Sequence, residues 1–169
     1  MIIRLVSLCV VLTDQVSKHL ISRYCRLGDS IAVIRNFLDI TFVQNPGAAF
    51  GFMAGTKAAV RIPFFTAITL GAALIVYAYQ RFIPSEKKPE RFALGLIWGG
   101  AMGNFIDRIF RRNVVDFIDV RFYQHHWFPY IFNIADSCIT VGLILLIALR
   151  YSGKGGVLKT GMKAAVRRP

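Results

Sequence analysis

Acidic residues and cysteines are scarce in this sequence. Of its 169 residues, 9 are acidic and 21 are basic, which gives a formal net charge of +12, and 3 are cysteines. Cys9, Cys25 and Cys138 show neither C-x-x-C pairing nor the spacing of metal ligands. These absences argue against a disulfide-stabilised domain and against a zinc site. We therefore interpret the cysteines as structural and expect no metal ion or other cofactor.

The excess of basic residues is common in nucleic-acid-binding proteins, but its distribution here favours another class. Hydrophobic residues make up 55% of the chain, above the roughly 45–50% of soluble domains. The basic residues lie mostly between apolar runs, and the densest group stands at the C-terminus. Charge in these places is typical of the flanks of membrane spans. We expect one compact membrane domain in contact with lipid, and no nucleic-acid partner.

Four apolar segments predict an α-helical integral membrane protein with four transmembrane helices, since roughly 20 apolar residues cross a bilayer. The third segment carries Gly95, Gly99 and Gly103, whose spacing permits close helix packing. The expected spans are 2–21, 62–81, 92–110 and 129–149, within a membrane domain of residues 1–152 that precedes a basic tail at 153–169.

The positive charge also predicts the orientation in the membrane. The acid-free tail and the short segment 81–91 carry the densest positive charge, so they and both termini are expected in the cytoplasm. Arg108, Arg111 and Arg112 would then fall on the outer face, which counts weakly against this orientation.

Residues 22–57 are predicted to form a small β-region on the outer side. Leu38, Ile40 and Phe42 recur at every second position, as in a half-buried strand. This strand ends at the turn sequence Asn45-Pro46-Gly47, and the apolar residues 48–52 are candidates for a second strand.

Asp136 is the only formal charge in the apolar run 127–149. A carboxylate within a membrane span is energetically costly and is a functional candidate by default; the alternative is an Asp that only joins helices. A helix that begins near Pro129 would place Asp136 about 10 Å along it. Asp116, in an expected loop at 110–126, would return to the same membrane face and meet Asp136.

Two neighbouring carboxylates share a proton, because both cannot ionise cheaply. One can then act as general base on a water molecule while the other, protonated, polarises a peptide carbonyl. Proton-coupled carriers also use buried Asp pairs, so the pair alone leaves both a peptidase and a carrier open. A non-catalytic scaffold that packs through its glycine-rich helix is a third possibility.

Asp14 and Lys18 are four residues apart, so they share a helix face and can form an ion pair. The sequence leaves open whether this is an interfacial pair at the helix end or has a direct role. His125 and His126 are adjacent and would point in opposite directions on a strand. With no third ligand near them, we expect exposed loop histidines and no metal site.

Five short blocks resemble, in order and in spacing, the signature motifs of the lipoprotein signal peptidase (signal peptidase II) family. The resemblance covers almost the whole chain apart from the basic tail, and Pro46 stands where a small polar residue is expected. The blocks are Asp14-Gln15-Val16-Ser17-Lys18, Asn45-Pro46-Gly47-Ala48-Ala49-Phe50, Gly103-Asn104-Phe105-Ile106-Asp107-Arg108, Val114-Val115-Asp116-Phe117 and Phe132-Asn133-Ile134-Ala135-Asp136-Ser137.

The resemblance implies four transmembrane helices with an extracytoplasmic β-cradle, in the bacterial cytoplasmic (inner) membrane. It implies an aspartic endopeptidase that removes the signal peptide from diacylglyceryl-modified prolipoproteins, just before the lipid-bearing cysteine. Cyclic peptides such as globomycin are implied as inhibitors. Asp116 and Asp136 match the catalytic pair of the family. The matches to its substrate-binding positions are Asn45, Asn104, Arg108 and Asn133, and the matches to supporting positions are Asp14, Lys18, Gly47, Asp107, Ala135 and Ser137.

Overall fold

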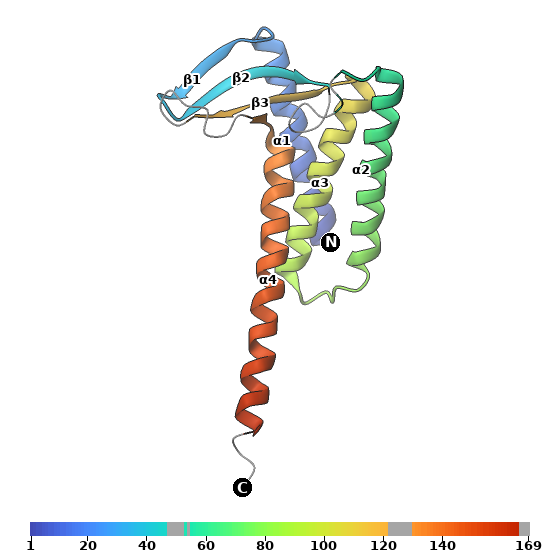
Figure 1. Ribbon diagram of the computed structural model, residues 1–169, viewed down its shortest axis with the longest axis vertical. Coiled ribbons are helices and arrows are strands. Elements are labelled where there is room, and N and C mark those ends of the chain that lie inside the picture. The colour runs from blue at the N-terminus through green and yellow to red at the C-terminus, as the bar shows by residue number, and fades with distance from the viewer. Residues whose placement is uncertain (47–52, 54, 122–129, 166–169) are drawn as a thin grey trace.

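The computed structural model describes residues 1–46, 53, 55–121 and 130–165 of the chain. In these residues, long helices lie side by side and a small sheet lies across one end of them (Figure 1). In chain order the elements are α1 (Ile2–Tyr24), β1 (Ser30–Ile34), β2 (Leu38–Asn45), α2 (Ala58–Gln80), α3 (Lys88–Phe110), β3 (Val114–Val120), β4 (Ile131–Phe132) and α4 (Ile134–Ala165).

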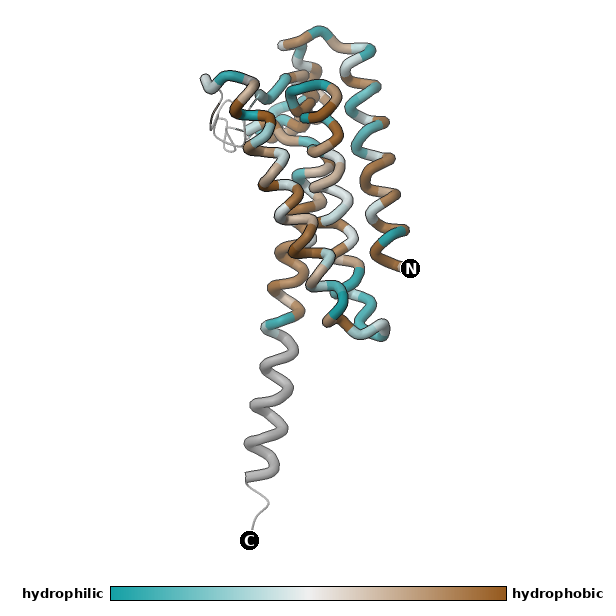
Figure 2. The backbone as a smooth tube through the Cα atoms, turned by 90° about the vertical axis from the view of Figure 1, so that its right-hand side faces the viewer, coloured by the Kyte–Doolittle hydropathy of each residue, from teal (hydrophilic) through white to brown (hydrophobic). Residues whose placement is uncertain are grey.

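The helices have the length and composition of a membrane protein. In the described part of the chain, three segments are long and apolar enough to cross a membrane: α1, Ala59–Gln80 of α2 and Ile134–Tyr151 of α4. Figure 2 shows hydrophobic residues along the helices, while hydrophilic ones gather at the turn between α2 and α3 and around the sheet. The predicted helical membrane fold with a small sheet is therefore confirmed, and the crossing of the membrane by α3 stays a prediction.

The start of α4 differs from the prediction. Residues Ile131–Phe132 form strand β4 beside β3, so the apolar run does not become helical near residue 129. The helix begins at Ile134, which places Asp136 in its first turn and not about 10 Å along it. At its other end α4 continues to Ala165, well beyond the other helices (Figure 1).

The described strands form one antiparallel sheet in the order β1-β2-β3-β4. The strand predicted around Leu38, Ile40 and Phe42 is confirmed as part of β2. The expectation of a loop at 110–126 is wrong for residues 114–120, because their backbone pairs with β2 on one side and β4 on the other. The second strand expected at 48–52 lies outside the described residues.

Close approach of α3 to its neighbours brings distant polar residues together. A Cβ added at Gly99 would lie 2.7 Å from the Cβ of Val10 on α1, and one at Gly103 would lie 2.5 Å from Oδ2 of Asp14. The packing role predicted for the spaced glycines is therefore confirmed. This close packing brings α1, α3 and the first turn of α4 into contact just below the sheet.

Candidate active site

The carboxylate of Asp116 is enclosed by side-chain amides. Asp116 lies in β3 and is 2% exposed. Its Oδ2 accepts a hydrogen bond from Nδ2 of Asn45 at 2.9 Å, and its Oδ1 accepts one from Nδ2 of Asn133 at 2.6 Å. A buried carboxylate is tolerated only where such partners replace water. The two amides therefore stabilise Asp116 in this place and fix the direction of its oxygens.

Asn45 reaches Asp116 because of an irregularity in the sheet. Asp39 of β2 pairs with Asp119 of β3, and an unbroken ladder would set Val43 opposite position 115. A register shift instead sets Val43 opposite Asp116. An extra residue in one strand turns every later side chain to the other face. The bulge thus places Asn45 on the same face of the sheet as Asp116.

Asp136 is held by a reciprocal cap at the start of α4. Its backbone N–H donates to Oδ1 of Asn133 at 2.9 Å, and its own Oδ2 accepts from the backbone N–H of Asn133 at 3.4 Å. This is the capping-box arrangement, in which the N-cap and the third helical residue satisfy each other. The other oxygen, Oδ1, accepts from Nδ2 of Asn104 on α3 at 2.7 Å.

Asn133 joins the two aspartates. Its side-chain oxygen binds the first turn of α4 at Asp136, while its side-chain nitrogen donates to Asp116. Burial, and after it the negative charge of Asp136, raise the pKa of the Asp116 carboxyl to about 7. Two carboxyl groups coupled in this way can share one proton near neutral pH.

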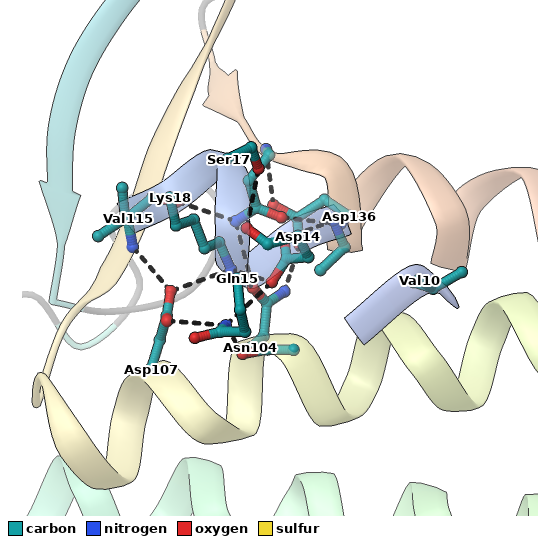
Figure 3. Close-up of polar contacts among 12 residues, drawn as sticks. Val10, Asp14, Gln15, Ser17, Lys18, Asn104, Asp107, Val115 and Asp136 are labelled. Atoms are coloured by element: carbon teal, nitrogen blue, oxygen red, sulfur yellow. Dashed lines mark hydrogen bonds and ion pairs between the residues drawn. The ribbon is translucent and has the colours of Figure 1, made fainter. Parts of the chain in front are cut away.

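A second group of charges, which includes Asp14, Lys18 and Asp107, lies beside Asp136 (Figure 3). Lys18 and Asp14 are both 0% exposed, which excludes an ion pair at the exposed end of the helix. The ammonium of Lys18 lies 2.8 Å from Asp14 and 2.9 Å from Asp107, and it donates to Oδ1 of Asn104 at 3.0 Å. Arg111 adds a second positive charge on Asp107.

The two acids of this cluster also hold the backbone beside the aspartate pair. Oδ2 of Asp107 accepts from the backbone N–H of Val115 at 3.1 Å, and Oδ1 of Asp14 accepts from the backbone N–H of Ala135 at 3.0 Å. Val115 directly precedes Asp116, and Ala135 directly precedes Asp136. Each buried acid therefore fixes the segment that carries one member of the pair.

The remaining predicted residues lie around this centre. Arg108 of α3 donates to the backbone oxygen of Asn104 at 3.3 Å, with its guanidinium 5.0 Å from the centroid of the Phe65 ring. Ser137 donates to the backbone oxygen of Asn133 at 2.9 Å. Gly47 and the two histidines at 125 and 126 lie outside the described residues.

A protein family and several known proteins resemble this chain over most of its length. The family model for signal peptidase (SPase) II matches residues 6–151. The chain belongs to the signal peptidase II family. The lipoprotein signal peptidase of Syntrophotalea carbinolica is 42% identical over 150 residues, which cover 89% of this chain and 91% of that protein. The lipoprotein signal peptidase of Geobacillus kaustophilus is 43% identical over 141 residues, 83% of this chain and 87% of that protein.

The fold agrees with this membership. A bacterial membrane enzyme solved by the in meso method at 2.3 Å resolution superposes with a TM-score of 0.78 and 37% sequence identity, over 91% of this chain and 90% of that one. A second such structure, at 1.9 Å, gives a TM-score of 0.74 and 38% identity over 87% of this chain and 90% of that one. The family resemblance carried by the five sequence blocks is thereby confirmed, and the chain is a peptidase.

The roles of two polar residues, one beside the site and one on the other face of β3, went unpredicted. Gln15 donates through Nε2 to Asp14, to Asp107 at 3.1 Å and to the backbone oxygen of Gly103 at 3.0 Å. Its place inside the first signature block was the available signal. Asp119, which lies in the segment expected to be a loop, is 2% exposed and lies 2.7 Å from Arg121. No feature of the sequence alone predicts the burial of Asp119 or its pairing with Arg121.

Proposed function

We propose that this chain is an aspartic endopeptidase that removes signal peptides from diacylglyceryl-modified bacterial prolipoproteins. Removal of signal peptides from prolipoproteins is the activity of its family. The aspartic mechanism, and cleavage just before the lipid-bearing cysteine, are our proposal. One observation carries it: Asn133 binds the carboxyl group of Asp116 and the first turn of α4 at Asp136, so the two acids share one partner.

In the proposed mechanism, Asp116 holds the shared proton and Asp136 is ionised. A pKa of about 7 for Asp116 keeps a large share of it protonated at neutral pH. Asp136 takes a proton from water, and the resulting hydroxide attacks the carbonyl carbon of the scissile peptide bond. Asp116 gives its proton to the carbonyl oxygen as the tetrahedral intermediate forms. Asp136 then protonates the leaving amine, the carbon–nitrogen bond breaks, and Asp116 recovers its proton from the intermediate.

The substrate would be held by the amides and the guanidinium that surround the pair. An extended peptide in a dry site needs partners for its backbone N–H and C=O groups. We assign this role to Asn45, Asn104, Arg108 and Asn133. Cyclic peptides such as globomycin would compete for the same place.

The depth of the pair fits a lipid-anchored substrate. We propose that all four helices cross the bacterial inner membrane, with both termini in the cytoplasm and the sheet as an extracytoplasmic β-cradle. Asp136, in the first turn of α4, then lies at the outer end of a span. An acyl chain contributes about 0.8 kcal/mol per buried CH₂, so the anchor would hold the scissile bond at this depth.

A proton-coupled carrier is the alternative that the sequence left open. Such carriers typically show internal repeats or paired broken helices, and the described helices are continuous over their full lengths. The deciding experiment incubates the protein, in detergent and with EDTA, with a diacylglyceryl-modified precursor peptide. A peptidase yields the shorter lipopeptide that begins at the modified cysteine. A carrier or a scaffold yields no product.

The same precursor without its diacylglyceryl group is the matched control. It should be cut far more slowly, because it lacks the anchor that holds it at the site. Equal rates for both peptides in the same detergent would contradict the proposed substrate class.

A further inference from the structure

Lys18 carries a buried charge that no step of the proposed mechanism uses. Its partners among the described residues are Asp14, Asp107 and Asn104. Two carboxylates already compensate its charge, so the contact with Asn104 is an additional one. Asn104 is also the residue that donates to Asp136. The Asn104 amide therefore links the buried ammonium of Lys18 to Asp136 (Figure 3).

The ammonium of Lys18 fixes the orientation of the Asn104 side-chain amide. A Lys side chain can only donate hydrogen bonds, so the atom of Asn104 beside it must be the oxygen. Asn133 donates to the same oxygen at 3.2 Å. With Oδ1 occupied by two donors, Nδ2 of Asn104 is directed at Oδ1 of Asp136, 2.7 Å away.

We propose that Lys18 is a positioning residue for the reaction: it orients the Asn104 amide so that an N–H faces Asp136 and favours the ionised carboxylate that serves as base. The inference rests on the proposed function. With the amide reversed, its oxygen would face the carboxylate, and that contact is favourable only when Asp136 carries a proton. A protonated Asp136 cannot take a proton from water.

The other charges around Asp136 come from different elements. Asp116 of β3, Arg108 of α3 and Lys18 of α1 all act on it electrostatically. Lys18 in turn faces Asp14 from its own helix and Asp107 from α3. A test must therefore separate the orientation of one amide from the charge balance of the buried cluster.

Arg111 provides the matched control, because it too places a positive charge on Asp107. Among the described residues, its side-chain partners are Asp107 and Gln15, and the side chain is 32% exposed. Lys18→Met and Arg111→Met each remove one cation from the same cluster, but only the first also removes a donor to the Asn104 oxygen. We expect Lys18→Met to move the acid limb of the kcat/KM profile, measured with the diacylglyceryl precursor peptide, upward by about one pH unit. Arg111→Met should leave the limb in place and lower only the unfolding temperature.

A second variant covers the case in which Lys18→Met does not fold. Adding Asp14→Asn removes one negative charge and restores the balance of the cluster, and the new amide oxygen can still accept from Ala135. The unfolding temperature should recover in Lys18→Met/Asp14→Asn. Its acid limb should stay about one pH unit above that of Asp14→Asn alone. Coincident limbs in these two folded proteins would overturn the proposal and make Lys18 purely structural.

Substitutions made in the Asn104→Leu variant test whether Lys18 acts on the pH profile through the Asn104 amide. If Lys18 acts through the amide, adding Lys18→Met should move the limb no further. A further shift of similar size would overturn the amide route. Failure of the proposed function is recognised separately: either the unsubstituted protein gives no product, or Asp116→Asn and Asp136→Asn still cleave the peptide.

Discussion

The side-chain nitrogen of Asn133 lies 2.6 Å from the Asp116 carboxylate, while the side-chain oxygen of the same residue caps α4. One amide thus fixes the distance between strand β3 and the helix that carries Asp136. The two contacts use different atoms, so substitutions can separate them.

Asn133→Ser keeps an oxygen that can cap α4, but its shorter side chain does not extend to Asp116 as the Asn133 amide does. We expect it to retain most of its stability and to lose most of its cleavage activity. Asn133→Ala loses both, and the missing cap should cost about 1 kcal/mol more. Thermal unfolding in detergent and the precursor cleavage assay measure the two effects. Cleavage by Asn133→Ser at the unsubstituted rate would show that the link to Asp116 is dispensable.

The bulge in β2 makes a prediction about two adjacent residues. Asn45 donates to Asp116, whereas Gln44 pairs opposite Val115 and is exposed. Removing the donor from a buried acceptor costs about 1–3 kcal/mol. Asn45→Ala should therefore lower kcat/KM by roughly ten- to a hundredfold, and Gln44→Ala should stay near the unsubstituted value. Equal effects of the two substitutions would mean that the face of the sheet on which Asn45 lies does not matter for cleavage.

The raised pKa of Asp116 predicts how stability depends on pH. Its value rises from 3.8 to about 7 in the folded protein, so between these pH values the folded state binds a proton that the unfolded state has released. Stability is highest at the acid end of this window and falls as pH rises, by up to about 1.4 kcal/mol per pH unit. In Asp116→Asn the unfolding temperature should fall less between pH 4 and pH 7. An unchanged slope would contradict the raised pKa.

The orientation in the membrane is open to a direct test with reporter fusions. A reporter active only outside the cytoplasm should be silent after residue 81 or at residue 169, because the positive charge there keeps those segments inside. The same reporter inserted between residues 22 and 57 should be active. The reverse pattern would place the sheet and the aspartate pair in the cytoplasm.

The helices could be predicted because apolar length is a local property of the sequence. The start of α4 could not, since Ile131–Phe132 is as apolar as the helix that follows. Its cap was nevertheless encoded, as Asn133 followed three residues later by Asp136. Strand β3 was predicted as loop because Asp116 and Asp119 fall on opposite faces of it and break the alternation of a half-buried strand.

The contacts of the site likewise divide into those that could be predicted from the sequence and those that could not. The pairing of Asp14 with Lys18 follows from their spacing on one helix, and the structure confirms it. The contacts of Lys18 with Asn104 and Asp107 depend on how closely α3 approaches α1. The bulge that turns Asn45 toward Asp116 depends on pairing between strands far apart in the sequence. Such long-range geometry has no signal in local composition.

The central claim is that Asp116 and Asp136 carry out the cleavage together. A carboxamide keeps the shape of the side chain but can neither accept the proton of water nor share one. Asp119 is unsuitable as a control, since it is buried, accepts from Thr41 at 2.9 Å and pairs with Arg121. Asp29 is exposed and its carboxylate accepts from the backbone of Arg26 at 2.7 Å, so Asp29→Asn is the control.

The most direct measurement is cleavage of the diacylglyceryl precursor peptide by the purified Asn variants of the two aspartates. Asp116→Asn and Asp136→Asn should each abolish product while the proteins stay folded and inserted. Because the pair acts as a unit, the double variant should be scarcely worse than either single one. Asp29→Asn should cleave normally. Cleavage near the unsubstituted rate by either folded single variant, Asp116→Asn or Asp136→Asn, would contradict the account.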